Sequence, residues 1–179
     1  VLSDTTYRPT MSDAGLSPTH AVQAVDESGD TCEVHVAGES PLTLYVDGRE
    51  IVTLMTLGTH PEALTIGYLR NQRFVGALEE IKQVEVDWRR EAVEVTTWNG
   101  IEGWDEKLKK RTVTTGCGQG TVFSCTLDSL YHSALPSVSV RQSTLYGLLE
   151  NIRQYNEIYK RAGAVHGCGL CRGNEILMF

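Results

Sequence analysis

The sequence predicts an α/β protein whose N-terminal part is rich in β-strands. Apolar residues alternate with polar ones within residues 42–57 and again within 81–98, which is the period of a half-buried strand. Between these stretches, over 60–73, and later over 142–161, apolar residues recur every three or four positions, which is the period of an amphipathic helix. We therefore expect strands and helices to alternate along one α/β chain.

The first residues lack such a period. Residues 1–19 are rich in serine, threonine and proline, and we expect a loose leader with no role in the core. Strands are expected from about His20 onward. The pair Asp47-Gly48 supplies the positive φ angles of a tight turn, so it predicts a hairpin between residues 42–46 and 51–57.

The period changes at Thr59. Thr59 and Glu62 have the spacing of a capping box, and Pro61 lies in the first turn, so a helix is expected over about 60–73. Two strands follow, at 81–88 and 92–98, where valines alternate with charged residues. The polar residues between them predict a turn and hence a second hairpin.

The strongest helical pattern lies near the C-terminus. Its apolar residues step by three and four over 142–161, with Ser143 as a candidate cap. These residues are Leu145, Leu148, Ile152, Tyr155 and Tyr159. Gly163 ends the helix, and the following alternation predicts a strand that turns at Gly173-Asn174 and pairs with residues 175–179.

Composition limits the function classes. The formal net charge is −7 and the lysines and arginines are scattered, so we predict no nucleic-acid partner. No apolar run approaches the roughly 20 residues that span a bilayer, so we predict no membrane contact. Five cysteines, an odd number in a chain of 179 residues, favour a reducing compartment. We expect a soluble cytoplasmic protein.

One cysteine lies in a glycine-rich segment without a packing pattern. Cys117 stands between Gly116 and Gly118, and we expect an exposed, mobile loop over 114–121. A free thiol with a pKa near 8.5 is mostly protonated at neutral pH, so a reactive cysteine needs access and cationic or backbone N–H groups around it. Flanking glycines let amide groups converge on an anionic sulfur. The alternative is a flexible loop with an incidental cysteine.

A second candidate lies close to the C-terminus. Cys168 and Cys171 form a C-x-x-C pair preceded by His166, so the three could supply soft metal ligands or a redox pair. In an extended strand, however, His166 and Cys168 face one side and Cys171 the other. This favours a buried strand without a bound metal. The remaining cysteines, Cys32 and Cys125, are expected to be small buried hydrophobic residues.

Several stretches resemble one known family. They are residues 44–51 (Leu-Tyr-Val-Asp-Gly-Arg-Glu-Ile), residues 55–74, the loop 111–120 and Gly163-Ala-Val-His166. From about residue 40 onward, the chain resembles the FdhD/NarQ family of formate dehydrogenase accessory proteins. The resemblance implies a carrier that receives sulfur from a cysteine desulfurase as a persulfide. It passes this sulfur to the molybdenum bis(pyranopterin guanine dinucleotide) cofactor, the acceptor, of formate dehydrogenase.

The resemblance also assigns roles to single residues. Cys117 matches the first cysteine of the family's C-x-x-C loop, the position that would hold the persulfide, and it is the one catalytic residue that we predict. Gly120 stands at the second cysteine position, which removes a local dithiol. His166 matches a histidine of the family's G-x-H-A-A stretch, and Cys168 stands where an alanine is usual.

The same resemblance implies a larger domain similar to the cytidine-deaminase fold, a layered α/β sheet. The predicted organisation is thus a leader over 1–19, a β-rich subdomain with one helix over 20–110, and the active loop with the start of the deaminase-like domain over 111–179. Because the last apolar run reaches Phe179, we expect this domain to continue beyond it.

Three functions remain open at this point. The first is a sulfur carrier acting through Cys117, with a cysteine desulfurase and the formate dehydrogenase apoenzyme as partners and a homodimer as a family-based expectation. The second is a non-catalytic chaperone of the cofactor or the apoenzyme, which Gly120 favours. The third is a small zinc or thiol-redox protein that uses Cys168, Cys171 and His166.

Overall fold

The computed structural model describes residues 7–104, 111–113, 121–123, 134 and 136–179. The described residues form two compact units. The first unit comprises the described residues up to residue 16 and from 39 to 134. The second unit comprises residues 17–38 and the described residues from 136 onward. Residues 17–38 thus group with the C-terminal residues. The domain boundaries after residues 19 and 110 stay a prediction.

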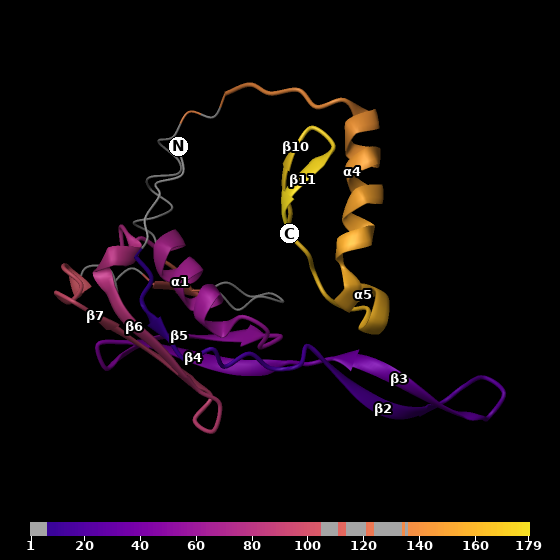
Figure 1. Cartoon of the computed structure of the whole chain (residues 1–179), viewed down its shortest axis with the longest axis horizontal. Coiled ribbons are helices and arrows are strands. Elements are labelled where there is room, and N and C mark those ends of the chain that lie inside the picture. Colours follow the sequence, from indigo (N-terminus) through magenta and orange to yellow (C-terminus); the bar gives the residue numbers. More distant parts are fainter. Residues whose placement is uncertain (1–6, 105–110, 114–120, 124–133, 135) are drawn as a thin grey trace. The chain divides into compact units, whose positions relative to one another are not determined.

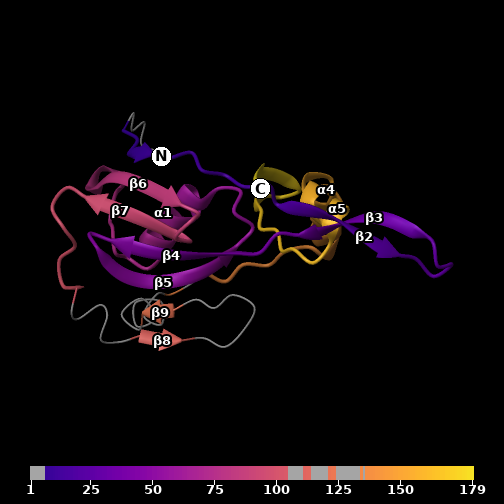
Figure 2. The same ribbon diagram turned by 90° about the horizontal axis from the view of Figure 1, so that it is seen from below.

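The first unit is built on a five-stranded sheet with strand order β1-β6-β7-β4-β5. Its strands are β1 (Thr10–Met11), β4 (Ser40–Val46), β5 (Arg49–Thr56), β6 (Ile81–Asp87) and β7 (Ala92–Thr97). The helix α1 (Pro61–Asn71) packs against β6 and β7, and the short 3-10 helix η1 (Leu78–Glu80) leads into β6 (Figure 1, Figure 2). The predicted α/β class and the strand-rich N-terminal region are confirmed, whereas the deaminase-like layering stays a prediction.

Both predicted hairpins of this unit are present. β4 pairs antiparallel with β5, and β6 pairs antiparallel with β7. Parallel pairing of β4 with β7 joins the two hairpins in one sheet. In the turn, Asp47 and Gly48 adopt φ angles of 49° and 76°, as a tight hairpin turn requires. The Asp47 carboxylate also accepts hydrogen bonds from the Thr97 backbone N–H (2.9 Å) and Oγ1 (2.7 Å), so the turn is tied to the end of β7.

The core of the first unit gathers the alternating apolar residues of these strands with residues of α1 and the chain that follows it. The fully buried members are Leu42, Leu44, Val46, Ile51, Leu69, Ile81, Val84, Val93 and Val95. Burial of apolar surface at this density is the main stabilising contribution to a domain of this size. The strand period read from the sequence therefore identifies the face that packs.

The start of α1 differs from the prediction. His60 is the N-cap and makes no side-chain capping bond, so the predicted capping box is wrong. The Glu62 carboxylate instead accepts hydrogen bonds from Ser12 Oγ (2.7 Å) and the Ala14 backbone N–H (2.8 Å). Burial opposes ionisation of Glu62, which is 7% exposed, but these hydrogen bonds outweigh it and hold the pKa of Glu62 below its ordinary value.

The N-terminal segment is consequently not a loose leader. β1 pairs parallel with β6, Ser12 Oγ accepts a hydrogen bond from the Val86 backbone N–H (3.0 Å), and Trp88 Nε1 donates to the Ala14 carbonyl (2.6 Å). The prediction that residues 1–19 take no part in the packing is wrong for residues 7–16. Backbone and hydroxyl groups make these contacts, and such groups leave no hydrophobic period in the sequence.

The second unit combines a two-stranded ribbon, two helices and a hairpin. Its elements are β2 (Thr19–Val25), β3 (Thr31–Ala37), α4 (Gln142–Tyr155), α5 (Glu157–Ala162), β10 (Leu170–Arg172) and β11 (Glu175–Met178). α5 packs against β3, and β11 packs against α4 (Figure 1). None of the helices in the described part of the chain combines the length and hydropathy that a membrane span requires.

The helix predicted over 142–161 is divided in two. It begins at Gln142 with Arg141 as N-cap, so Ser143 is not the cap, and it breaks at Asn156, whose φ and ψ are −85° and 70°. The Asn156 side chain accepts a hydrogen bond from the Tyr159 backbone N–H (3.1 Å) and caps α5. Asparagine competes well for backbone N–H groups, which explains why the hydrophobic period continues through a break in the helix.

The C-terminal hairpin is shorter than predicted. It turns at Gly173-Asn174 as expected, but its first strand begins only at Leu170 because β11 offers pairing partners from Glu175 to Met178 alone. Gly163 and Ala164 both adopt positive φ angles, which interrupts an extended path before the strand. The prediction of a continuous strand through residues 164–171 is therefore wrong for residues 164–169.

Candidate functional site

Cys117, the predicted catalytic residue, lies in residues 114–120, outside the described residues, so its exposure and mobility stay predictions. The chain on both sides is described. β8 (Arg111–Val113) and β9 (Thr121–Phe123) pair antiparallel, with Val113 opposite Thr121. Residues 114–120 thus connect two paired strands of the first unit, and the chain enters and leaves this segment at neighbouring points.

The second candidate group is described in full. His166 and Cys168 are exposed and precede β10, and Cys171 is half-buried on β10. The prediction that His166 and Cys168 lie on a buried strand is wrong, because the strand begins after them. Of the other cysteines, Cys32 is half-buried on β3 rather than fully buried, and Cys125 lies outside the described residues.

The described side chains do not gather into a metal site. Across the described ranges, no group of three or more histidine, cysteine, aspartate or glutamate side chains lies close enough to hold a metal ion. His166, Cys168 and Cys171 therefore do not converge, although their spacing in the sequence suits zinc. The short span of β10 accounts for this, because Cys171 belongs to the hairpin and the other two residues to the chain before it.

His166 instead borders a hollow of about 540 Å³ where α4 meets α5. Its lining residues are Ile152, Arg153, Asn156, Tyr159, Lys160, Val165, His166 and Gly167. The lining thus combines basic, aromatic and apolar side chains. No cysteine lies among the lining residues in the described part of the chain, so these residues cannot themselves carry sulfur. Of these lining residues, the sequence pointed only to His166. The break at Asn156, on either side of which Arg153 and Lys160 line the hollow, does not interrupt the hydrophobic period of the helix.

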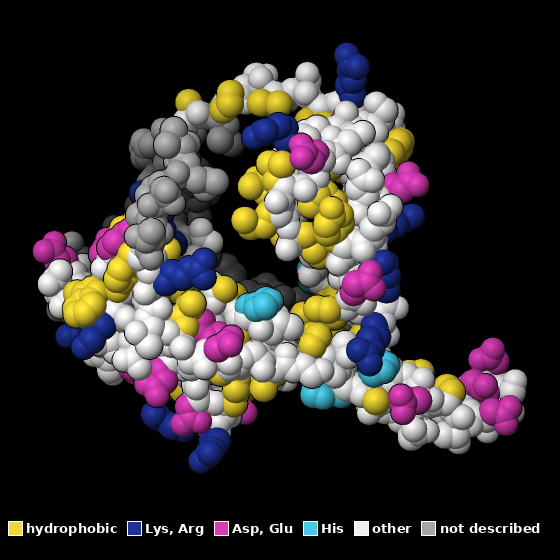
Figure 3. Space-filling view, viewed as in Figure 1, with side chains coloured by type: hydrophobic (Ala, Val, Ile, Leu, Met, Phe, Trp, Pro, Cys, Tyr) yellow, Lys and Arg dark blue, Asp and Glu magenta, His cyan; other side chains and the backbone are white. Residues whose placement is uncertain are grey.

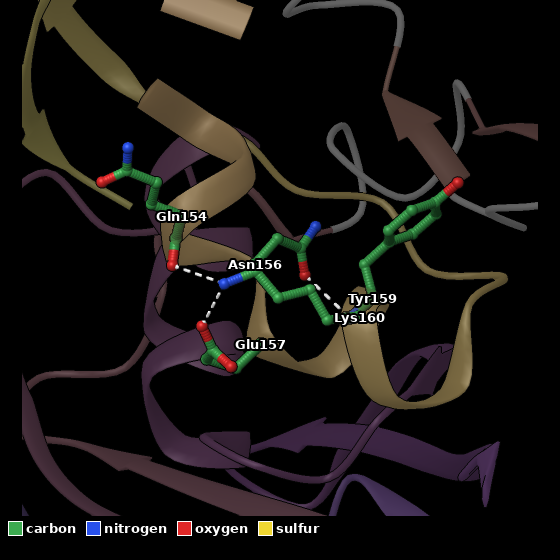
Figure 4. A network of polar contacts seen from close by, with 5 residues as sticks. All are labelled: Gln154, Asn156, Glu157, Tyr159 and Lys160. Carbon is green, nitrogen blue, oxygen red and sulfur yellow. Dashed lines mark hydrogen bonds and ion pairs between the residues drawn. The ribbon is translucent and has the colours of Figure 1, made fainter. Parts of the chain in front are cut away.

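Polar contacts hold the α4–α5 junction in place (Figure 4). Lys160 Nζ donates hydrogen bonds to Glu157 Oε1 (2.5 Å) and to the Gln154 carbonyl (3.1 Å), while Asn156 caps α5. Both members of the Lys160–Glu157 ion pair are well exposed, so the pair adds little to stability. Its effect is to orient the Lys160 ammonium beside the hollow.

Known relatives match most of the chain. The model of the FdhD/NarQ family matches residues 37–179. A sulfur carrier protein FdhD from Bacillus pumilus is 28% identical over 150 residues, which are 83% of this chain and 57% of the relative. A sulfur carrier protein FdhD from Listeria monocytogenes serotype 4b is 28% identical over 149 residues, which are 57% of that protein. The one from Bacillus subtilis is 28% identical over 156 residues, which are 59% of that protein. The chain therefore spans a little over half the length of these curated relatives.

A solved structure shares the fold. A protein from Desulfotalea psychrophila, assigned as a formate dehydrogenase accessory protein, aligns with a TM-score of 0.54 at 17% sequence identity. The alignment covers 88% of this chain and 58% of that protein. At this identity the likeness concerns the fold, whereas the family match rests on sequence over residues 37–179. This chain belongs to the FdhD/NarQ family.

Proposed function

We propose that this chain carries sulfur for the maturation of formate dehydrogenase, with Cys117 as the carrying thiol. The main support is the family match over residues 37–179, a range that includes Cys117, together with curated relatives that are named sulfur carriers. The glycines at 116 and 118 leave the sulfur free of bulky neighbours in the sequence. A carrier thiol must reach a donor and an acceptor in turn, and the glycines on either side suit that task.

In the first step, the Cys117 thiolate attacks the outer sulfur of a persulfide on a cysteine desulfurase. A new S–S bond forms at Cys117, the S–S bond of the donor breaks, and the donor cysteine leaves as a thiolate. This step exchanges one persulfide for another and requires no external oxidant or reductant. Lys107, Lys109, Lys110 and Arg111 precede Cys117 in the sequence, and positive charge beside a cysteine favours its thiolate.

In the second step, the outer sulfur passes to the molybdenum bis(pyranopterin guanine dinucleotide) cofactor. Delivery as sulfide requires two electrons, and a second thiol supplies them when it attacks the inner sulfur and forms a disulfide with Cys117. Gly120 stands where the family's loop has its second cysteine, so this thiol must come from outside the loop. The proposal therefore includes an external thiol as reductant.

The experiment follows sulfur from a ³⁵S-loaded cysteine desulfurase to this protein. We expect label on the wild type that is lost on treatment with a reducing thiol, and no label on Cys117→Ala. The matched control is the Cys168→Ala/Cys171→Ser double variant, which removes two thiols and leaves Cys117 in place. We expect this control to retain most of the transfer.

Two results would contradict the proposal. Transfer that survives Cys117→Ala but is absent from the double variant would place the carrier thiol at the C-terminal pair. Absence of label from every protein, with maturation of formate dehydrogenase still dependent on this protein, would favour the non-catalytic chaperone.

A further inference from the structure

A histidine of the β2–β3 ribbon contacts α5. Neighbouring residues of a strand point to opposite faces, and the register of the two strands shows that one face of the ribbon carries Thr19, Ala21, Glu33 and His35. α5 packs against β3, and the Arg161 guanidinium of α5 lies 3.1 Å from His35 Nε2. His35 is half-buried and Arg161 is exposed, so protons from the solvent can reach this contact.

The two contacts of His35 define one protonation state of its ring. A guanidinium has only N–H donors, so Nε2 must accept the hydrogen bond from Arg161 with its lone pair. The proton of the neutral ring is then on Nδ1, which lies 3.4 Å from the hydroxyl oxygen of the buried Thr19 and donates to it. Both ring nitrogens therefore have a partner only while the ring is neutral.

Protonation of the ring removes the acceptor. A proton on Nε2 would point at the N–H groups of Arg161, so two donors would meet and two positive groups would lie side by side. Histidine is the side chain that ordinarily changes its charge near neutral pH, with a pKa of about 6.5. A neutral ring, and with it the contact, is favoured above that pH, and a proton that enters the ring below it opposes the contact.

Two carboxylates can receive the separated charges. Glu33 stands two residues before His35 on the same strand face, about 7 Å along the strand, and favours a protonated ring. Glu157 stands four residues before Arg161 on α5, the spacing and order at which a carboxylate attracts an arginine on a helix. One of its oxygens, Oε1, accepts a hydrogen bond from Lys160 Nζ (2.5 Å), and the carboxylate has a second oxygen for Arg161. All of β2 is described, and it brings no charged side chain to this face.

The remaining acidic groups of the ribbon are far from this contact. Acidic side chains gather at the free end of the ribbon, whereas histidine and basic side chains lie at the end near α5 (Figure 3). The acidic residues of the turn are Asp26, Glu27 and Asp30. Asp30 stands five positions before His35, which is about 17 Å along an extended strand and exceeds the Debye length of about 8 Å. The charge balance at His35 is therefore local.

We propose that the His35–Arg161 contact is a pH-sensitive clasp, which is closed while His35 is neutral and which opens on protonation of His35, releasing the β2–β3 ribbon from α5 in mildly acidic solution. In the closed state Arg161 donates to His35. In the open state Arg161 turns to Glu157, and the protonated His35 ring is balanced by Glu33. A two-stranded ribbon is at best marginally stable alone, so opening of the clasp loosens the ribbon locally and leaves the first unit folded. The clasp does not depend on sulfur transfer, and protein without a persulfide is sufficient to test it.

Amide hydrogen exchange of the full chain, at pH values on either side of the ordinary histidine pKa of about 6.5, tests the clasp. The quantity compared is the protection factor, in which the pH dependence of the chemical exchange rate is already divided out, and the amides of β6 and β7 serve as internal reference. For the wild type we expect the protection of the β2 and β3 amides to fall roughly three- to tenfold in acid relative to the reference, the equivalent of one hydrogen bond. His35→Gln keeps an oxygen acceptor for Arg161 that does not titrate, so it should show no comparable loss.

Two further variants test each side of the contact. His20→Gln makes the same substitution at the other histidine of the ribbon, which lies on the opposite face, and should lose protection in acid as the wild type does. Arg161→Ala removes the donor from an exposed position of α5, so it tests the clasp even where a substitution of His35 disturbs the strand. Its ribbon should show the lower protection already above the histidine pKa and little further change in acid.

Three results would overturn the proposal. The first is ribbon protection in the wild type that does not change with pH relative to β6 and β7. The second is an acid loss that persists in His35→Gln or disappears in His20→Gln, because another group would then be the one that titrates. The third is Arg161→Ala with wild-type ribbon protection above the histidine pKa, because the contact would then not hold the ribbon.

Discussion

Glu62 provides a quantitative test of the packing of the N-terminal segment. Its carboxylate accepts two hydrogen bonds, at 2.7 Å from Ser12 Oγ and 2.8 Å from the Ala14 backbone N–H, and Ser12 Oγ in turn accepts one from Val86. This chain of contacts links α1, the N-terminal segment and β6. Removing the carboxylate leaves two donors in a partly buried place, at a cost of about 1–3 kcal/mol for each.

We therefore expect Glu62→Ala to lower the free energy of unfolding by about 2–4 kcal/mol, the lower part of the summed range, because water can still reach the two partly buried donors. Glu62→Gln keeps an oxygen acceptor and should cost about 1 kcal/mol. Urea unfolding followed by tryptophan fluorescence measures both, and Trp88 reports on the segment because its Nε1 donates to Ala14. Glu79→Gln makes the same substitution at an exposed carboxylate of η1 and serves as the control.

The dependence on pH has a defined sign. Because the folded state holds the pKa of Glu62 below the ordinary value of 4.5, the ionised carboxylate stabilises the protein above that value. The stabilisation is lost as the pH falls through the folded pKa. The difference in unfolding free energy between wild type and Glu62→Gln should thus be constant at neutral pH and shrink under acid conditions. A cost of Glu62→Ala below about 0.5 kcal/mol, or a difference that persists unchanged in acid, would refute the reasoning.

Two further predictions concern the first hairpin and the C-terminal cysteines. Asp47→Ala should lower the free energy of unfolding in urea by about 2–4 kcal/mol, because it removes the carboxylate that accepts two hydrogen bonds from Thr97. It also puts alanine at a φ of 49°, a conformation that asparagine and aspartate tolerate better. Asp47→Asn should therefore cost much less. Destabilisation of equal size by both variants would contradict this account. Protein purified without chelator should contain far less than one zinc per chain, since His166 and the nearby cysteines do not converge, and one tightly held zinc lost in Cys168→Ala would show the opposite.

The parts of the fold that follow a local rule could be predicted from the sequence. The positive φ angles of Asp47 and Gly48 depend on residue type, and the alternation in β4, β6 and β7 follows from one buried sheet face. The turn preference and the strand alternation each depend on residues close together in the chain, so both can be recognised in the sequence without tertiary structure. The choice of Cys117 likewise rests on its glycine neighbours and on the family resemblance.

Other features depended on partners distant in sequence. Glu62 has the spacing of a capping box, yet its carboxylate binds Ser12 and Ala14 instead, about 50 residues away, because the N-terminal segment presents its donors there. Residues 164–169 alternate like a strand but lack a strand to pair with.

The sequence by itself determined the family, the strand-rich N-terminal part and the candidate thiol. Only the tertiary structure decided that the N-terminal segment packs on the sheet, that α4 ends at Tyr155, and that a hollow beside His166 forms where α4 meets α5. The physical reason is that hydrogen bonds from backbone and hydroxyl groups depend on where donors and acceptors meet in space, and a hydrophobic period records only burial.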